Sequence, residues 1–289
     1  MALQSESFLL RRYIEKAMVD LPAMPAIVMQ VVQATERDDV TTAEIEELLN
    51  KDPAMATKVL KVVNSAYFGL PRQITNIGHA VAILGLQQIR NLALSLGVLN
   101  ALSSSNARVR DIQRMFWQNS FAAGCCAGHI SRKRGLNKRD AELVFVGALL
   151  HDIGRLFLLT LFNIPYQQVM RESTNRTLPM RLVEQKVLGT THAELGAELA
   201  ERWNFPVDLV KLIRNHDGEF NEETTDAEFA VHICDVFADS IAEPEFVGLV
   251  TPVNGRARVW AGLTDEDAAE IRTKMKESLE QSQALLGIL

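Results

Sequence analysis

The chain carries at residues 144–159 the stretch VFVGALLHDIGRLFLL, in which His151 and Asp152 stand between two apolar runs. Burying an ionised carboxylate beside an imidazole costs roughly several kcal/mol unless a partner or a metal compensates the charge. Four partners could do so: a divalent metal, an arginine such as Arg155, backbone amides at a helix end, or solvent at an open cleft. Which partner Asp152 finds decides whether this stretch belongs to an enzyme.

Helical patterning extends outward from this stretch over almost the whole chain. Apolar residues recur every three to four positions, and helix-start signals precede them, such as Asp52 followed by Pro53 and the Thr-x-x-acidic pattern at 41–44 and 264–267. Strand-like alternation of polar and apolar residues is almost absent. The sequence therefore predicts an all-α fold of about a dozen helices of the length usual in globular proteins.

Two segments interrupt the helical period and mark candidate boundaries. Residues 103–106 read Ser-Ser-Ser-Asn, a small polar segment that is the best candidate for a joint. Residues 243–255 contain two prolines and two glycines, which break the second half of the chain. We expect an N-terminal helical part to about residue 102, a central part that carries His151 and Asp152, and a C-terminal helical tail.

Composition bounds the class of protein. A length of 289 residues with 47% hydrophobic residues is enough for one large or two modest domains. The formal net charge of −6 argues against nucleic acid as a main partner. Cys125, Cys126 and Cys234 lack CxxC spacing and indicate reduced thiols of a cytoplasmic protein. The first residues lack a signal-peptide pattern and no uninterrupted apolar run approaches the length of a membrane span, so no membrane partner is expected.

The His151-Asp152 pair has two interpretations. The pair falls near the end of a helix expected to begin at Asp140, where the negative end of the helix dipole favours a cation. Imidazole and carboxylate ligands suit Fe, Mn, Zn or Mg. The alternative is structural, with a helix-terminal histidine and with Asp152 capping the turn through Gly154.

His192 is the second candidate ligand. Thr191 and Glu194 have the spacing of a capping box, which places His192 in the first turn of a helix and leaves its ring available as a ligand. A surface histidine without such a role is the alternative.

Two further candidates lie nearer the C-terminus. His216 and Asp217 follow an apolar helical stretch, and the alternative to a ligand role is an ordinary polar helix terminus. Asp235 lies in an apolar helix at the margin of a polar stripe, and the alternative is an exposed aspartate. Such residues at helix ends can meet in a bundle to form a site for one or two metals. We assign ordinary core or surface roles to the remaining histidines, which are His79, His129 and His232.

Motifs in the N-terminal third narrow the fold. They are LPAMP at 21–25, VLKVVNSAYF at 59–68, AVAILG at 80–85 and RNLALS at 90–95. In this order they closely resemble the HDOD family, the HD-related output domain of bacterial signalling proteins. The later His and Asp residues resemble the ligand order of the HD superfamily of metal-dependent phosphohydrolases.

The resemblance implies an HD-domain-like helical bundle with an N-terminal helical subdomain. It divides the chain into an N-terminal helix (1–20), an HDOD domain (21–217) and a C-terminal helical extension (218–289). Within the domain, the N-terminal helical part extends to about residue 102, and the HD-like part covers 108–217.

The resemblance also implies a metal site. This sequence departs from the superfamily pattern of that site at two places. Position by position, the ligands would be His151, Asp152, His192, His216 and Asp235, with Asp217 as a further carboxylate. Asn119 stands where the superfamily has its first histidine, and 216–220 read HDGEF, without the Gly-Tyr-Pro loop of the HD-GYP phosphodiesterases. An amide is a poor ligand for a catalytic transition metal, and losing one ligand loosens the geometry that hydrolysis requires.

Two hypotheses about function follow. In the first, the chain is a non-catalytic module that acts through contacts with signalling proteins, can form homo-oligomers, and keeps a degenerate site for Fe, Mn, Mg or Zn. In the second, it is a metal-dependent phosphohydrolase, either a phosphodiesterase or a nucleotide phosphohydrolase, in which Asp152 bridges two ions. Asn119 and the missing loop favour the first. The substrate, partner and input signal stay open.

Overall fold

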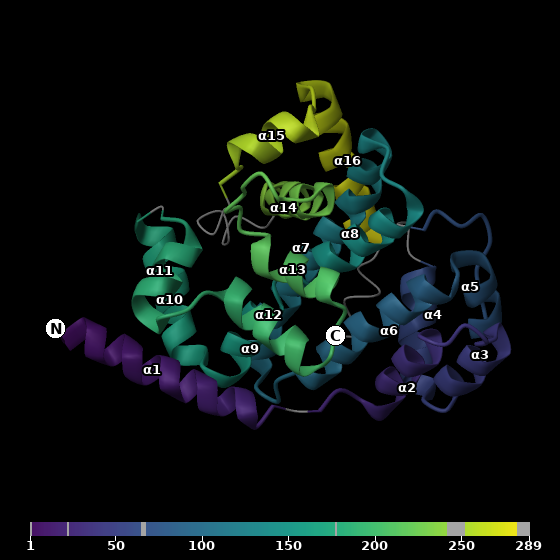
Figure 1. The fold of residues 1–289 in the computed structure, drawn as a ribbon, viewed down its shortest axis with the longest axis horizontal. Coiled ribbons are helices and arrows are strands. Elements are labelled where there is room, and N and C mark those ends of the chain that lie inside the picture. The colour runs from purple at the N-terminus through teal and green to yellow at the C-terminus, as the bar shows by residue number, and fades with distance from the viewer. Residues whose placement is uncertain (1, 22, 65–67, 177, 242–251, 282–289) are drawn as a thin grey trace. The chain divides into compact units, whose positions relative to one another are not determined.

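The computed structural model describes residues 2–21, 23–64, 68–176, 178–241 and 252–281, which form helices and connecting turns without strands (Figure 1). The prediction of an all-α fold is confirmed. The helices are α1 (Ala2–Val19), α2 (Ala26–Thr35), α3 (Thr42–Asn50), α4 (Pro53–Val63), α5 (Ile77–Leu84), α6 (Leu86–Ala101), α7 (Ala107–Arg134), α8 (Lys138–Leu150), α9 (Ile153–Leu161), α10 (Asn163–Arg176), α11 (Met180–Leu188), α12 (His192–Arg202), α13 (Val207–Asn215), α14 (Asp226–Asp239), α15 (Gly255–Ala261) and α16 (Asp265–Gln281).

The described helices are more numerous than the sequence predicted, because tight turns divide the long apolar stretches. Gly85 adopts a φ of 88°, which L-residues rarely reach, and there the chain bends by 119° between α5 and α6. His151 and Asp152 form a two-residue turn between α8 and α9, without a bend as sharp as the one at Gly85. The His-Asp pair therefore lies at a short break between two apolar helices.

The predicted helix-start signals take part in capping. Asp52 accepts a hydrogen bond from the Met55 amide at 3.0 Å, and Thr191 forms a reciprocal capping box with Glu194. The expected start of α8 at Asp140 is wrong by two residues. Asn137 caps this helix by accepting a hydrogen bond from the Asp140 amide, because asparagine is as good an N-cap as aspartate.

Two compact units make up the chain. Unit 1 comprises Met1–Leu21 and Ser104–Lys276, and unit 2 comprises Pro22–Ser103 and Glu277–Leu289. The division after Ser103 falls within the polar segment 103–106. The other predicted break, 243–255, lies mostly outside the described residues, apart from its end, where Asn254 caps α15.

Unit 2 contains helices α2 to α6, which pack around an aliphatic core. Val28, Ile45, Val59 and Ile89 are fully buried within it. The Asn64 side chain follows α4 and exchanges two hydrogen bonds with the backbone of Ile74, at 2.7 and 2.8 Å. The described part of the loop between α4 and α5 is thereby fixed to the end of α4.

Unit 1 is built around the long helix α7, against which α8 and α14 pack, while α12 packs against α9 and α13 (Figure 1). The segment Lys138–Leu161, which is α8 and α9 together, is long and apolar enough to cross a membrane. Its uninterrupted apolar runs are shorter, as expected from the sequence, because His151, Asp152 and Arg155 divide them. In this fold, however, 89% of the apolar window is buried inside the protein, as in the core helix of a globular domain.

A close crossing of α9 and α12 positions the centre of unit 1. A Cβ atom on Gly154 would collide with the carbonyl oxygen of His192, and a Cβ on Gly196 would lie 3.2 Å from the Gly154 amide nitrogen. Only glycine permits this approach. As a consequence, the start of α9 and the start of α12 lie against each other, and so do the polar residues at these two helix starts.

Candidate metal site

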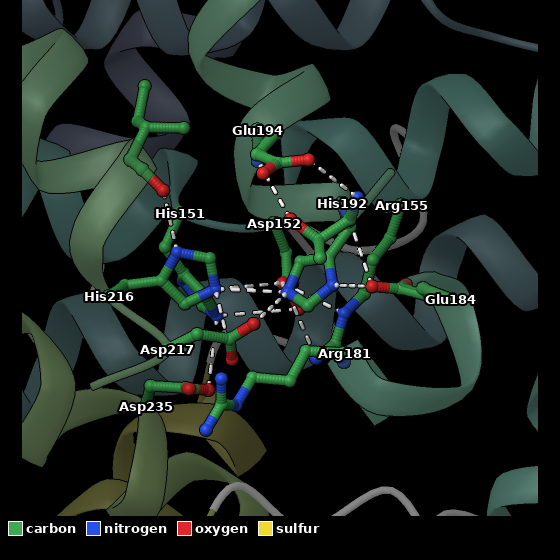
Figure 2. Close-up of polar contacts among 12 residues, drawn as sticks. His151, Asp152, Arg155, Arg181, Glu184, His192, Glu194, His216, Asp217 and Asp235 are labelled. Atoms are coloured by element: carbon green, nitrogen blue, oxygen red, sulfur yellow. Dashed lines mark hydrogen bonds and ion pairs between the residues drawn. The ribbon is translucent and has the colours of Figure 1, made fainter. Parts of the chain in front are cut away.

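Six polar side chains converge in unit 1 from the ends or interiors of five helices (Figure 2). All six residues predicted from the sequence are brought together here. They are His151 after α8, Asp152 before α9, His192 at the start of α12, His216 and Asp217 after α13, and Asp235 within α14. Their role as ligands stays a prediction.

Backbone carbonyls fix the orientation of two of the histidines. His151 Nδ1 lies 2.7 Å from the Ala148 carbonyl oxygen, and His216 Nδ1 lies 2.7 Å from that of Ile213. A carbonyl oxygen can only accept, so each Nδ1 carries a proton and donates it. In the neutral ring, the lone pair is therefore on Nε2, and Nε2 faces the centre of the cluster.

A buried carboxylate orients the third histidine. Glu184 Oε2 accepts hydrogen bonds from the Nδ1 of His192 at 2.6 Å and from its backbone amide at 3.0 Å. Glu184 Oε1 accepts another from the Tyr166 hydroxyl at 2.9 Å. A histidine fixed by a carboxylate at Nδ1 is the arrangement found behind many metal-binding imidazoles, since it directs Nε2 at the metal and raises its basicity.

His192 Nε2 lies 3.1 Å from His216 Nε2. Two lone pairs at this distance repel each other, so either a proton or a metal ion must lie between them or beside them. Burial lowers the pKa of His216 to about 4, while Glu184 raises the pKa of His192 despite burial. Without metal, His192 is therefore the donor and neutral His216 the acceptor.

The carboxylates of the cluster are short of hydrogen-bond donors. Asp235 Oδ1 is 3.2 Å and Asp152 Oδ2 is 3.4 Å from His151 Nε2. Within the described part of the chain, neither oxygen of Asp152 or Asp235 accepts a hydrogen bond, although both side chains are buried. Buried carboxylates without donors are rare in stable proteins, and this arrangement fits the binding of a cation.

Protonation of His151 compensates part of this charge in the absence of metal. Burial opposes the protonation, but the two neighbouring carboxylates hold the pKa of His151 well above its usual value. Burial likewise favours neutral Asp152, yet Arg155 and His151 hold its pKa well below the usual range. Metal binding at this cluster would therefore replace a proton on His151.

Arg155 is the arginine partner that the sequence offered for Asp152. Its Nε lies 3.0 Å from Asp152 Oδ1 and its Nη2 lies 3.4 Å from His192 Nε2, with the side chain almost fully buried. The N–H groups of Arg155 make no hydrogen bond to the carboxylate, so the contact is an ion pair only. The capping interpretation is wrong, because the Asp152 side chain makes no capping hydrogen bond to α9.

Two other structural alternatives fail because the residues concerned are buried. His192 and Asp235 are fully buried, so neither is a surface residue. The polar stripe expected beside Asp235 is also buried, since Glu228, His232 and Asp239 face the interior. His216 is buried as well, and only Asp217, with 15% of its side chain exposed, reaches solvent.

His232 has the ordinary core role predicted for it. Its Nδ1 donates to the His216 carbonyl oxygen at 2.8 Å, and its Nε2 accepts from the Asn254 amide at 2.9 Å. Both ring nitrogens are thus used. His232 therefore supports the backbone of His216 and is not itself a candidate ligand.

Asn119, at the position of the superfamily's first histidine, lies on α7. Its side-chain amide donates to Asp239 Oδ1 at 3.2 Å, one helical turn beyond Asp235. This amide is engaged with Asp239, which is not one of the six predicted ligands. Asn119, which replaces the superfamily's first histidine, therefore contacts Asp239 and none of the predicted ligands through this hydrogen bond.

Glu184 and Tyr166 were not among the residues predicted from the sequence. A signal for Glu184 was present, because it stands four residues after Met180 and four before Leu188, both buried residues of α11. An acidic residue in the apolar stripe of a helix requires a buried partner. No comparable local signal in the sequence indicates Tyr166. Its hydroxyl contacts Glu184 because α10 packs against α11.

The cluster contains two overlapping triplets of potential ligand atoms. In each triplet the atoms lie within 4.8 Å of one another. One triplet is His151, His216 and Asp235, and the other is Asp152, His192 and His216. Imidazole nitrogens combined with carboxylate oxygens fit Zn, Fe or Mn better than Mg or Ca. The residues present therefore fit a divalent transition metal.

Unit 1 is thus a helical bundle that brings histidines and aspartates together, most of them at helix ends. The family model of the HDOD domain matches residues 21–218, and this chain belongs to that family. A curated relative from Treponema pallidum (strain Nichols), described as an uncharacterized protein, is 28% identical over 214 residues. The match covers 74% of this chain and 41% of the relative, so the chain spans about two fifths of that protein.

Solved structures share the fold. A candidate phosphohydrolase from Shewanella amazonensis SB2B has a TM-score of 0.70 and 23% identity, with 94% of this chain and 97% of that chain covered. An HDOD domain protein of unknown function from Geobacter sulfurreducens has a TM-score of 0.67 and 21% identity, with 95% and 98% covered. A candidate signal transduction protein from Marinobacter aquaeolei VT8 has a TM-score of 0.74 and 17% identity, with 99% and 65% covered. At these identities the likeness concerns the fold alone.

Proposed function

We propose that this protein is a regulatory HDOD module that binds a divalent metal in its buried His/Asp cluster and acts through contacts with other signalling proteins, without hydrolysing phosphoesters. The observation that carries the metal site is the facing pair of Nε2 atoms in His192 and His216, 3.1 Å apart. Buried carboxylates without donors lie beside them. Carboxylates without donors are costly in a metal-free core, and both features become favourable around a cation.

The ligands would come from the six convergent residues, and the imidazoles favour Mn, Fe or Zn. A bound divalent ion would supply positive charge that neutralises the buried carboxylates and joins helices far apart in sequence. The protein's own part is to hold the rings in place. The carbonyls of Ala148 and Ile213 and the carboxylate of Glu184 fix the three Nδ1 atoms before any metal arrives.

Burial of the cluster supports a regulatory over a hydrolytic role. A phosphoester must reach a metal-bound nucleophile, which requires an open coordination position facing solvent or a cleft. Of the six residues, five are buried and only Asp217 is partly exposed. The engagement of Asn119 with Asp239 further reduces the ligand set that hydrolysis would use.

Exposed apolar side chains support protein contacts. On α1, Phe8, Leu9 and Tyr13 are mostly exposed, and on α10 Ile164 is 80% exposed. Apolar groups at helix surfaces lose unfavourable hydration when another protein covers them. Signalling proteins and a second copy of this chain are both partners of this kind.

The proposal is tested by metal titration together with an activity assay on the full chain. Metal-stripped, tag-free protein should bind Mn²⁺ and unfold at a higher temperature with it, because a ligand that binds only the folded state stabilises it. Asp235→Asn should lose most of this shift. Asp208→Asn, a change at an exposed carboxylate on α13, should keep it.

Bis(p-nitrophenyl) phosphate and cyclic dinucleotides should remain intact with added Mn²⁺ or Fe²⁺. Absence of any metal binding would refute the proposed site. Turnover that disappears in Asp152→Ala would refute the non-hydrolytic role.

Phosphohydrolysis is the second candidate, and one observation favours it. All six predicted residues converge, and two of their carboxylates accept no hydrogen bond from the described residues. In that case Asp152 would contact two ions, as in two-metal hydrolases. The same activity assay decides between the candidates.

A further inference from the structure

We propose that Arg155 takes the place of a second metal ion, so that the cluster holds a single divalent metal on its His151-His216-Asp235 side. This inference rests on the proposed metal site and specifies its stoichiometry. It would make Arg155 the residue that separates this site from a two-metal centre. The six side chains divide between two sides of the cluster, and the two sides differ in charge.

The two ligand triplets compete for one atom. His216 belongs to both, and its Nδ1 donates to the Ile213 carbonyl, so only Nε2 offers a lone pair. One lone pair binds one ion. Two ions could be held only if one of them did without His216 and depended on the remaining residues of its own side.

The Asp152-His192 side already contains a cation. The Arg155 Nε is 3.0 Å from Asp152 Oδ1, and the Nη2 is 3.4 Å from His192 Nε2. These are the oxygen and the nitrogen that a metal on this side would require. A guanidinium stays charged under all ordinary conditions, so it opposes a second positive ion at these distances.

Arg155 is held in this position by its place in the fold. It lies in the first turn of α9, three residues after Asp152, at the crossing where Gly154 meets α12. Its guanidinium lies 5.6 Å from the centre of the Phe116 ring on α7, within cation–π distance. The side chain is only 3% exposed, so moving it away would require another partner for a desolvated charge.

On the His151 side, the ion-pair partner of Asp235 among the described residues is the His151 ring, which is not a permanent cation. Asp235 Oδ1 faces His151 Nε2 at 3.2 Å, and both Asp235 oxygens are buried without a hydrogen bond from the described residues. Asp152 directs its second oxygen, Oδ2, toward the same His151 nitrogen at 3.4 Å. Nε2 of His216 completes the set. Asp235 therefore lacks a permanently charged partner, whereas on the other side Arg155 lies beside Asp152 Oδ1, and Asp217 lies 3.6 Å from His192 Nε2.

The test measures the number of Mn²⁺ ions bound by the full-length chain, using equilibrium dialysis with elemental analysis and Mn²⁺ EPR. We expect one ion in the natural protein and two in Arg155→Met, where an uncharged side chain of similar length leaves Asp152 and His192 free. Arg155→Lys, which keeps a positive charge, should bind one. Arg139→Met, at an exposed arginine on α8, is the matched control and should also bind one.

Comparing substitutions of a histidine on each side of the cluster gives a second, independent test. His151→Ala should lose the ion, whereas His192→Ala should keep it with less than about tenfold weaker affinity, the lower limit for loss of supporting contacts around a metal. Circular dichroism of each variant verifies folding.

Two ions in the natural protein, or one in a folded Arg155→Met, would overturn the role of Arg155 and leave the metal site intact. No ion in either protein would instead overturn the metal site itself.

Discussion

Glu184 shows how much a single buried carboxylate can organise. It is fully buried on α11 and accepts from Tyr166 on one oxygen and from the ring and backbone of His192 on the other. A buried ionised group is tolerated when every oxygen has a donor. The orientation of the His192 ring therefore depends on a hydrogen-bond network that runs from Tyr166 on α10 through Glu184.

Tyr166→Phe tests this network. The change leaves Glu184 Oε1 buried without its donor, and it should lower the free energy of unfolding by about 1.5–3 kcal/mol, the usual range for hydrogen bonds to charged groups. Urea denaturation followed by circular dichroism measures the change. Tyr13→Phe, at a tyrosine 64% exposed on α1, is the control and should change stability by less than about 0.5 kcal/mol. Equal effects at the two positions would show that the buried hydroxyl contributes nothing.

Among the helices, the crossing of α9 and α12 brings the two halves of the cluster together. Asp152 and Arg155 belong to the start of α9, and His192 begins α12. Their separation is set by backbone contact at Gly154 and Gly196, where side chains would hold the helices apart. The geometry of the candidate site is therefore a consequence of helix packing.

Gly154→Ala should disturb both stability and the site. The new methyl group would meet the His192 carbonyl oxygen, which is backbone and cannot rotate away. Overpacking of this kind costs up to about 3 kcal/mol. Thermal unfolding should show a lower midpoint, and the Mn²⁺-dependent shift should shrink because Asp152, two residues before Gly154, is displaced from His151.

Gly255→Ala provides the comparison for this glycine change. Gly255 begins α15, and no atom lies within 4 Å of the position that a Cβ would occupy there. Alanine should therefore be neutral or stabilise the protein by up to about 1 kcal/mol. If both variants were equally stable, close contact at the α9-α12 crossing would not explain the need for Gly154.

Across the whole molecule, the chain separates into two units with different content. All six candidate ligands, Arg155 and Glu184 lie in the 104–276 part of unit 1. Unit 2 packs an aliphatic core of its own from α2 to α6. Stability in such a molecule need not be uniform, because each unit can open with its own free energy.

Metal binding should therefore protect unit 1 selectively. We expect Mn²⁺ to slow amide hydrogen exchange in α8, α9 and α12 to α14, and to leave exchange in α2 to α6 unchanged, because the ligand stabilises only the unit that binds it. Mass spectrometry of peptic fragments measures this. Asp235→Asn should abolish the difference. Equal protection in both units would show that they open together.

Local signals in the sequence were enough to predict the fold class and the position of many helix starts. Capping signals such as Asp52-Pro53 and Thr191 with Glu194 act within one turn, so their residues are neighbours in any fold that forms the helix. The sequence also supplied the six residues that converge in unit 1, through their resemblance to a known ligand order. Their ligand role stays a prediction.

The surroundings of those residues became known only from the folded chain. The ion pair of Arg155 with Asp152 was one of four open alternatives, and Glu184 behind His192 was not foreseen. Likewise Asp235 is buried, although its place on a polar stripe allowed exposure. These contacts depend on which helices pack together, and packing involves residues far apart in sequence. Capping and periodicity, in contrast, depend on neighbours within a turn or two, so they can be predicted from the sequence.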